Sequence, residues 1–152
     1  MSRRVALSLT AGVVVLGGAG AFALAYAGDQ PPALAHSTAR YTAPDGDRDG
    51  SLSFSTEVTA SGGVKSVKVL AYPAQSALAE KAPTAEEMAA EEPAICMVVD
   101  TDTARCTYTV RVTAAEAASS PQGSWHVAVL ATAADGSTTL DTRAAGFTLR
   151  TR

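Results

Sequence analysis

Three aspartates at alternate positions are the best candidates for metal chemistry in this chain. Asp45, Asp47 and Asp49 precede Gly50, which reproduces the D-x-D-x-D-G beginning of a calcium-binding loop. Oxygen ligands at these positions, with a glycine at the turn, suit a hard cation. However, the twelfth position is Thr56 where that loop needs a bidentate glutamate, and a strand pattern follows in place of a helix. Two interpretations stay open: a loose surface calcium site, or a solvated Asp/Gly turn.

Ser124 and His126 are the nearest approach to a catalytic pair. They share one face of a predicted strand, and acyl transfer needs such a hydroxyl and imidazole together with an orienting carboxylate and an oxyanion hole. No motif supplies the last two, and the other histidine, His36, precedes the predicted domain. The acidic stretch 86–92 is typical of a solvated helix surface. We therefore predict that the protein is not an enzyme and, calcium apart, uses no cofactor.

The two cysteines of the chain, Cys96 and Cys106, are predicted to form a disulfide. Residues 105–113 alternate between apolar and polar side chains, with Cys106 on the apolar face. If 95–99 pairs antiparallel with that strand through a turn at 100–102, Cys96 falls directly opposite Cys106, at a separation that a disulfide can span. For a loop of about ten residues the chain-entropy argument gives roughly 2.5 to 3 kcal/mol of stabilisation.

The first 27 residues have the organisation of an export signal. Arg3 and Arg4 precede an almost uninterrupted apolar run, and Ala25-Tyr26-Ala27 fits the pattern that signal peptidase accepts. We expect cleavage after Ala27, with Ala33-Leu34-Ala35 as a second site, and hence a secreted protein. Two alternatives stay open, because the run is long enough for an uncleaved membrane anchor and the paired arginines also fit the twin-arginine route.

Removal of this signal makes the chain more acidic, which bears on its partners. The chain has 12 basic and 15 acidic residues, and the loss of Arg3 and Arg4 leaves 10 basic residues, a net charge of −5. Nucleic acid is therefore excluded as an expected partner, because its binding depends on Lys and Arg that neutralise phosphates. We also expect no membrane association after cleavage. The predicted layout is a flexible linker at 28–44 and one domain at 45–152.

Most of the predicted domain alternates with the period of a β-strand. Residues 51–59 place Leu52, Phe54, Thr56 and Val58 on one face. Further strands are predicted at 64–72, 124–133 and, as one bent strand or two, 138–150. Two short helical stretches, 77–81 and 85–92, interrupt the pattern, and a third helical turn begins at Thr113. The prediction is a mainly β protein, an immunoglobulin-like antiparallel β-sandwich with short helical insertions.

Four segments together resemble a known family: Ser66–Pro73, Ala82–Met88, Cys106–Val110 and Trp125–Ala133. They look like a domain of unknown function from secreted actinobacterial, largely Streptomyces, proteins, over about residues 45–150. The segment from Gly123 to Val129, with the later Asp-Gly turn, is also similar to the closing strands of bacterial immunoglobulin-like modules. The resemblance implies a fold and carries over no catalytic or binding residue.

Two non-enzymatic functions remain as hypotheses. In the first, the domain is a binding or structural module for an extracellular protein or an envelope polysaccharide. In the second, the disulfide-tied hairpin 97–105 is the inhibitory loop of a secreted protease inhibitor, with Arg105 or Met97 entering the specificity pocket of the protease.

Overall fold

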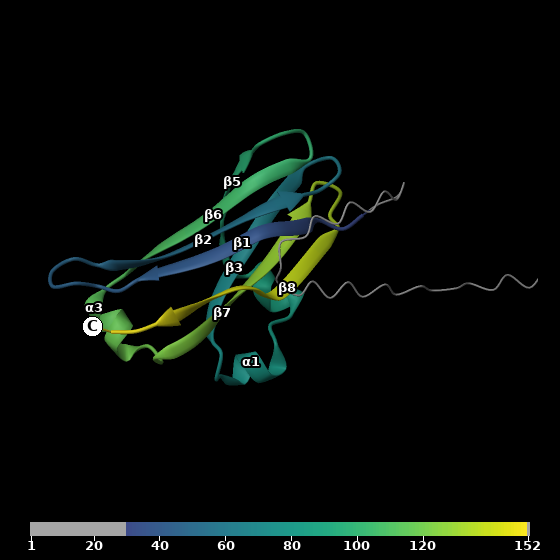
Figure 1. The fold of residues 1–152 in the computed structure, drawn as a ribbon. Coiled ribbons are helices and arrows are strands. Elements are labelled where there is room, and N and C mark those ends of the chain that lie inside the picture. Colours follow the sequence, from purple (N-terminus) through teal and green to yellow (C-terminus); the bar gives the residue numbers. More distant parts are fainter. Residues whose placement is uncertain (1–29, 152) are drawn as a thin grey trace, which may run out of the picture.

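The computed structural model describes residues 30–151, which form two antiparallel β-sheets packed face to face (Figure 1). This confirms the predicted mainly β sandwich. In the described part of the chain, no helix is long and apolar enough to cross a membrane. The predicted export signal at 1–27 lies outside the described residues.

Each sheet has four strands, and the chain passes between the sheets several times. The first sheet has the order β1 (Ala33–Thr42), β2 (Gly50–Thr59), β6 (Thr103–Val112) and β5 (Ile95–Val98). The second has the order β4 (Glu92–Pro93), β3 (Val64–Pro73), β7 (Gly123–Ala133) and β8 (Thr138–Leu149). The helices are α1 (Ala77–Lys81), α2 (Ala85–Ala89) and α3 (Ala114–Ser119).

The strand order is that of an immunoglobulin constant domain with one added strand. If all strands except β4 are lettered A to G along the chain, the first sheet reads A-B-E-D and the second reads C-F-G. The added strand β4 lies beside β3 at the edge of the second sheet. The disulfide differs from the antibody pattern, because it joins neighbouring strands of one sheet and does not cross between sheets.

The core between the sheets is built from the inward side chains of both. Phe54 and Val58 of β2 are fully buried against Val67, Val127 and Val129 of the second sheet. The alternate residues Ser53, Ser55 and Glu57 of β2 face outward and are polar, which is the alternation of a strand with one dry face. The faces that the sequence predicts for β2 are therefore the observed ones.

The first strand corrects the predicted domain boundary. The linker prediction for 28–44 is wrong for β1, which pairs with β2 from Ala33 to Thr42 and starts the domain before residue 45. Its alternation is hard to recognise because the register shifts between Ala35 and Thr38, where a bulge interrupts the period of two. The hydroxyl of Thr139 in β8 also donates to the carbonyl of Pro32 at 2.5 Å. Cleavage after Ala35 would thus remove the beginning of a paired strand.

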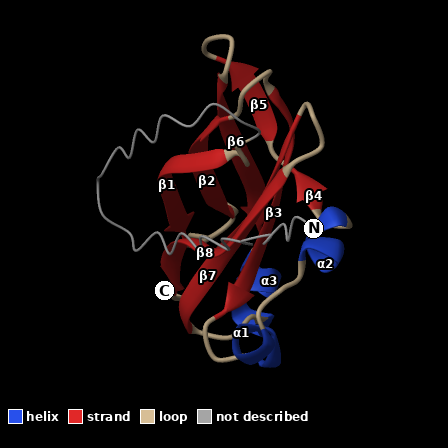
Figure 2. Cartoon of the chain, turned by 90° about the vertical axis from the view of Figure 1, so that its right-hand side faces the viewer, coloured by secondary structure: helices blue, strands red, loops and turns tan. Residues whose placement is uncertain are grey.

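The outer face of the second sheet carries a smaller apolar core. Ala128 and Leu130 of β7 pack there with Tyr72 of β3 and with Met88 of α2, whose side chain is fully buried. Figure 2 shows α1 and α2 beside β3 and β7, on the side away from β1 and β2. The predicted helical insertion therefore has a structural role, because it covers a strand that is apolar on both faces.

Side-chain caps define the short helices. At α2 the hydroxyl of Thr84 accepts from the backbone N–H of Glu87, whose carboxylate accepts from the N–H of Thr84. Thr113 and Glu116 form the same reciprocal pair at α3. Helices of five or six residues are too short to be stable alone, so these caps and tertiary packing hold them. Both helices begin where the sequence predicts them.

Candidate functional site

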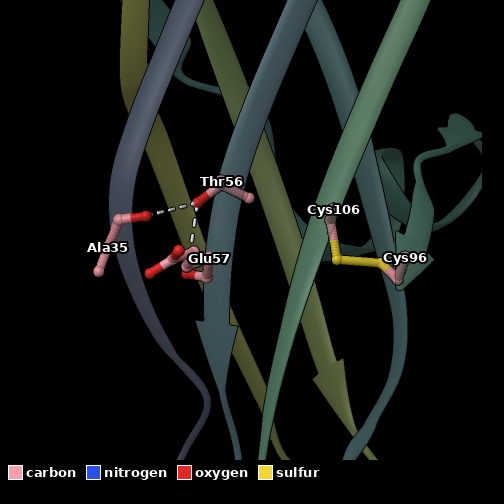
Figure 3. The surroundings of a disulfide bond; sticks show 5 residues. All are labelled: Ala35, Thr56, Glu57, Cys96 and Cys106. Carbon is pink, nitrogen blue, oxygen red and sulfur yellow. Dashed lines mark hydrogen bonds between the residues drawn. A yellow bond between two sulfur atoms is a disulfide. The ribbon is translucent and has the colours of Figure 1, made fainter. Parts of the chain in front are cut away.

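The disulfide fixes an edge strand to the first sheet. Cys96 of β5 and Cys106 of β6 are directly opposite in the strand register, with their Cα atoms 4.0 Å apart (Figure 3). The structure thus contains the predicted pairing. Cys106 is fully buried, whereas Cys96 is half-buried at the border of the core. The bond therefore anchors β5, the last strand of its sheet, to the interior.

Beside this bond lies a group of exposed apolar residues on both faces of β5 and directly after it, which we call the apolar edge. It consists of Ile95, Met97, Val98 and Val99, which are 78, 72, 81 and 58 % exposed. Single exposed apolar residues are ordinary, but consecutive ones on an edge strand mark an interaction site or an aggregation hazard. The neighbouring outward side chains of β2 and β6, such as Ser53, Ser55, Thr107 and Thr109, are polar.

The backbone of β5 has hydrogen-bonding groups that face away from the sheet. On one side the N–H of Ala94 donates to the carbonyl of Val67, and on the other the N–H of Val99 donates to Thr103. Because successive N–H groups of a strand point in opposite directions, those of Cys96 and Val98 point with that of Ala94, away from β6. No strand of the described residues is paired with Cys96 and Val98 on that side. The beginning of β3 lies across a cavity of about 310 Å³ that Cys96 and Val98 also line.

The tip of the β5–β6 hairpin is held in a defined conformation. The carboxylate of Asp100 accepts from the backbone N–H groups of Asp102 and Thr103 at 3.0 and 2.9 Å. The carboxylate of Asp102 accepts from the N–H of Gly62, and its carbonyl accepts from the N–H of Ala60 at 2.7 Å. These bonds attach the tip to the turn between β2 and β3, so the hairpin is preorganised.

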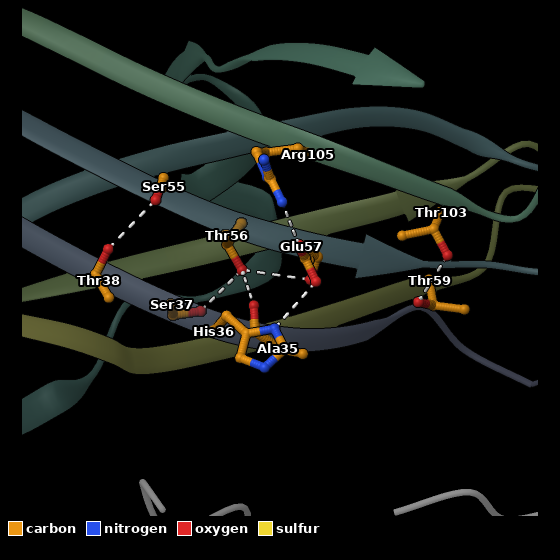
Figure 4. A network of polar contacts seen from close by, with 10 residues as sticks. All are labelled: Ala35, His36, Ser37, Thr38, Ser55, Thr56, Glu57, Thr59, Thr103 and Arg105. Carbon is orange, nitrogen blue, oxygen red and sulfur yellow. Dashed lines mark hydrogen bonds and ion pairs between the residues drawn. The ribbon is translucent and has the colours of Figure 1, made fainter. Parts of the chain in front are cut away.

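Arg105 does not lie at the tip but on the outer face of the first sheet. Its guanidinium donates to Glu57 of β2 at 2.7 Å, and His36 of β1 lies 3.0 Å from the other oxygen of that carboxylate (Figure 4). The bond from Arg105, followed by that from His36, lowers the pKa of Glu57 below 4.5. Of the two residues predicted for an inhibitory loop, only Met97 is exposed without such a partner among the described residues.

A buried threonine satisfies the backbone at the β1 bulge. The hydroxyl of Thr56 donates to the carbonyl of Ala35 at 3.2 Å and shares a hydrogen bond with the hydroxyl of Ser37 at 2.8 Å (Figure 4). Between Ala35 and Ser37, the backbone of His36 adopts a φ of 53°, and its ring lies toward Glu57. His36 therefore belongs to the sheet surface and not to a linker before the domain.

The aspartates of the calcium-like motif form a hairpin turn. Asp45 and Arg48 exchange two backbone hydrogen bonds at 2.9 and 3.0 Å, and Asp49 pairs with Arg111 of β6. Between residues 30 and 151 there is no group of three or more His, Cys, Asp or Glu residues placed to hold a metal ion. The structure therefore does not bring Asp45, Asp47 and Asp49 together as calcium ligands. Their segment is the turn that connects β1 to β2.

The glycine of the same motif has a steric explanation. Gly50 is buried at the start of β2, and a Cβ there would lie 2.2 Å from the carbonyl oxygen of Thr42 and 2.7 Å from the nitrogen of Pro44. Only glycine permits this approach of two backbones.

Ser124 and His126 are not arranged as a nucleophile and its base. No hydrogen bond joins them in the described part of the chain, and Ser124 is exposed while His126 is half-buried with its ring edge-on to Tyr72, at 5.6 Å between centroids. Burial, with a smaller contribution from Arg143, lowers the pKa of His126 below 6.5. The imidazole is part of the packing around the outer core.

A cleft that sequence reasoning missed lies between the sheets. Its lining includes Glu116 of α3, the helix that Figure 1 shows at one end of the sandwich. Its volume is about 470 Å³, within the usual range for small-molecule sites. Four aromatic residues on four different strands line it: Tyr41, Tyr108, Trp125 and Phe147. Phe147 stacks between Tyr41 and Trp125, at centroid distances of 6.0 and 5.8 Å. Residues so far apart in sequence carry no local signal.

The polar lining of the cleft is mainly acidic. Glu91, Glu92 and Glu116 contribute carboxylates, and the one cationic lining residue, Arg111, is paired with Asp49. Tyr108 donates to Glu92 at 3.0 Å, and burial together with that bond raises the pKa of Tyr108 to about 12. Hydrogen bonds from Thr113 lower the pKa of Glu116, so this carboxylate is charged at neutral pH.

Comparison with known proteins identifies the domain but not its activity. Residues 34–131 match the profile of a family of unknown function, DUF5707. The match begins in β1 and ends in β7, so it includes the strand that was predicted to be a linker. No curated protein matches the chain significantly.

Proposed function

Since the chain belongs to DUF5707, a family of unknown function, we propose a role from its own surface: it is a non-catalytic binding module that accepts an extended segment of a partner protein along β5. The apolar edge is the observation that supports this proposal most directly. The predicted export signal is a further part of it and places the partner in the envelope or the medium.

Strand addition explains why backbone and side chains are exposed together at this edge. The outward N–H groups of Cys96 and Val98 offer main-chain hydrogen bonds, while apolar side chains on both faces of β5 offer contacts to alternate residues of an added strand. The disulfide and the bonds at the tip hold β5 in place before binding, which lowers the entropic cost of association.

Charge indicates the chemistry of the partner segment. The apolar edge itself has no charged side chain, and it is continued at the tip by Asp100 and Asp102. An apolar extended segment followed by basic residues complements this arrangement. Complementary charge at the border of an interface favours correct register and faster association.

Substitution of one residue tests this mode of binding. Val98→Pro removes an outward N–H without touching the pairing to β6, whereas Val98→Ala keeps the N–H and is the matched control. The purified protein and both variants are immobilised and exposed to culture supernatant and solubilised envelope. We expect a protein to be retained by the wild type and Val98→Ala but not by Val98→Pro, and to protect the amides of Cys96 and Val98 from hydrogen exchange.

Thermal unfolding of each variant first establishes that it is folded. If Val98→Pro does not fold, Met97→Ser provides a second variant of the apolar edge. A partner that Val98→Pro retains equally, or that leaves those amides unprotected, would refute strand addition. Retention of polysaccharide alone, unaffected by both edge variants, would refute it as well.

Exposure of Met97 within a disulfide-tied hairpin favours one second candidate, the inhibition of a secreted protease. The assay adds the purified protein to trypsin-like and subtilisin-like proteases. Because Arg105 is bonded to Glu57, Met97→Ala and not Arg105→Ala should abolish inhibition. Absence of inhibition at micromolar concentration removes this candidate.

A further inference from the structure

The cleft between the sheets is a second site, separate from the apolar edge. β6 begins at the hairpin tip beside β5, whereas Val110, Arg111 and Val112 at its other end line the cleft. The cleft residues of β6 thus lie toward the opposite end of that strand from the hairpin tip, and the two sites come closest at Ile95, which pairs with Thr107 beside the cleft-lining Tyr108.

Aromatic rings determine which ligands the cleft suits. Tyr41, Phe147 and Trp125 form a continuous stack, and Tyr108 lines the cleft from β6. The faces of aromatic rings carry partial negative charge and attract cations, most strongly at tryptophan. Aliphatic neighbours such as Leu52 and Val69 add an apolar wall.

The charges around the rings select the same class of ligand. Glu92 and Glu116 are both held by hydrogen bonds that orient their carboxylates, and Glu91 lies beside them in the lining. Arg111, which would repel a cation, is paired with Asp49. An acidic rim over aromatic walls disfavours anions and complements a positive charge.

Tyr41 contributes its ring and not its hydroxyl to the cleft. The hydroxyl oxygen is buried and has no hydrogen-bond partner among the described residues. Because water cannot reach this oxygen, a molecule in the open cleft cannot reach it either, so the ring is the part of Tyr41 that a ligand meets.

We propose that the cleft binds a small organic cation, with its alkylammonium group against the rings and the carboxylates. The proposal does not depend on strand addition at β5.

The protein contains a suitable reporter, because Trp125 is its single tryptophan and lines the cleft. Tryptophan fluorescence is titrated with choline and with 3,3-dimethylbutan-1-ol, a neutral molecule of the same shape. We expect a saturable change with choline at a Kd about tenfold lower than that of the neutral molecule. Equal affinity for the two molecules, or no change with choline up to about 10 mM, would overturn the proposal.

Two double variants that each remove two negative charges test whether the carboxylates of the cleft itself bind choline. Glu91→Gln/Glu92→Gln removes two carboxylates of the cleft, and Glu80→Gln/Glu86→Gln removes two from α1 and α2, outside its lining. The first pair should weaken choline binding about tenfold and the second should leave it unchanged. An equal effect of both pairs would mean that only net charge matters and would also overturn the proposal.

Discussion

The outer face of β7 and the edge strand β5 are both apolar, but the described residues cover only the first. Leu130 of β7 is buried with Met88 of α2, whereas Met97 and Val98 of β5 are 72 and 81 % exposed and nothing in residues 30–151 lies over them. A helical insertion between β3 and β4 makes the first surface part of the fold. The second therefore remains accessible to another molecule.

Two methionines test this difference most strongly. Met88→Ala should lower the free energy of unfolding by about 2 to 5 kcal/mol, because it empties a fully enclosed site. Met97→Ala should change it by no more than about 0.5 kcal/mol, because the side chain is already in solvent. Urea unfolding of both variants measures the difference. Similar losses would mean that β5 is covered in solution and that the contrast is not real.

We expect the stability of β5 to depend on the disulfide, whereas the stability of the outer face of β7 depends on burial. Reduction of the bond between Cys96 and Cys106, which are 10 residues apart, should lower the free energy of unfolding by about 2.5 to 3 kcal/mol. Amides of β5 should then exchange faster than those of β7. Urea unfolding and hydrogen exchange with and without reductant test this, and uniform acceleration throughout the domain would contradict a local role.

Protonation should affect the covered face first as the pH falls. The folded-state pKa of His126 lies below 6.5, so the unfolded state binds the proton more tightly. The stability linked to this group is present above pH 6.5 and declines as the pH falls below it. We expect His126→Gln to flatten the pH dependence of the urea midpoint just below pH 6.5. An unchanged slope would place the ring in solvent.

The uncovered face of the first sheet should give the smallest effect. The pKa of Glu57 is lowered, so its contribution is present above pH 4.5 and is lost as the pH falls further. Because this network with Arg105 and His36 is exposed, Glu57→Gln should alter the acid unfolding midpoint only slightly and less at high salt. A large, salt-independent loss of stability would show that this polar surface is a major stabilising element.

Local patterns in the sequence predict much of the fold. The alternation of β2, the opposed cysteines of β5 and β6, and the Thr–Glu caps of α2 and α3 all depend on residues close in the chain. Each expresses one physical requirement, such as a dry strand face or a satisfied helix terminus. The predicted bounds of β2 and β5 nearly coincide with the observed ones, whereas the helix predicted at 85–92 ends at Ala89 and Glu92 begins β4.

What the sequence could not predict depends on contacts between distant segments. A bulge hides the period of β1, and the calcium-like motif is a turn whose glycine is required by the backbone of Thr42. The cleft unites Tyr41, Trp125 and Phe147 only after the sheets are stacked. Exposure of the apolar edge likewise follows from the position of β5 at the end of its sheet.

The short span of the disulfide has a consequence for biosynthesis. Because the chain has two cysteines and they face each other across one hairpin, oxidation within a molecule can produce only one pairing. Hairpins close within microseconds, far faster than thiols oxidise, so the partners are already aligned when an oxidant reaches them. Maturation should therefore proceed without isomerase, and even simple air oxidation of recombinant material should yield a single covalent form.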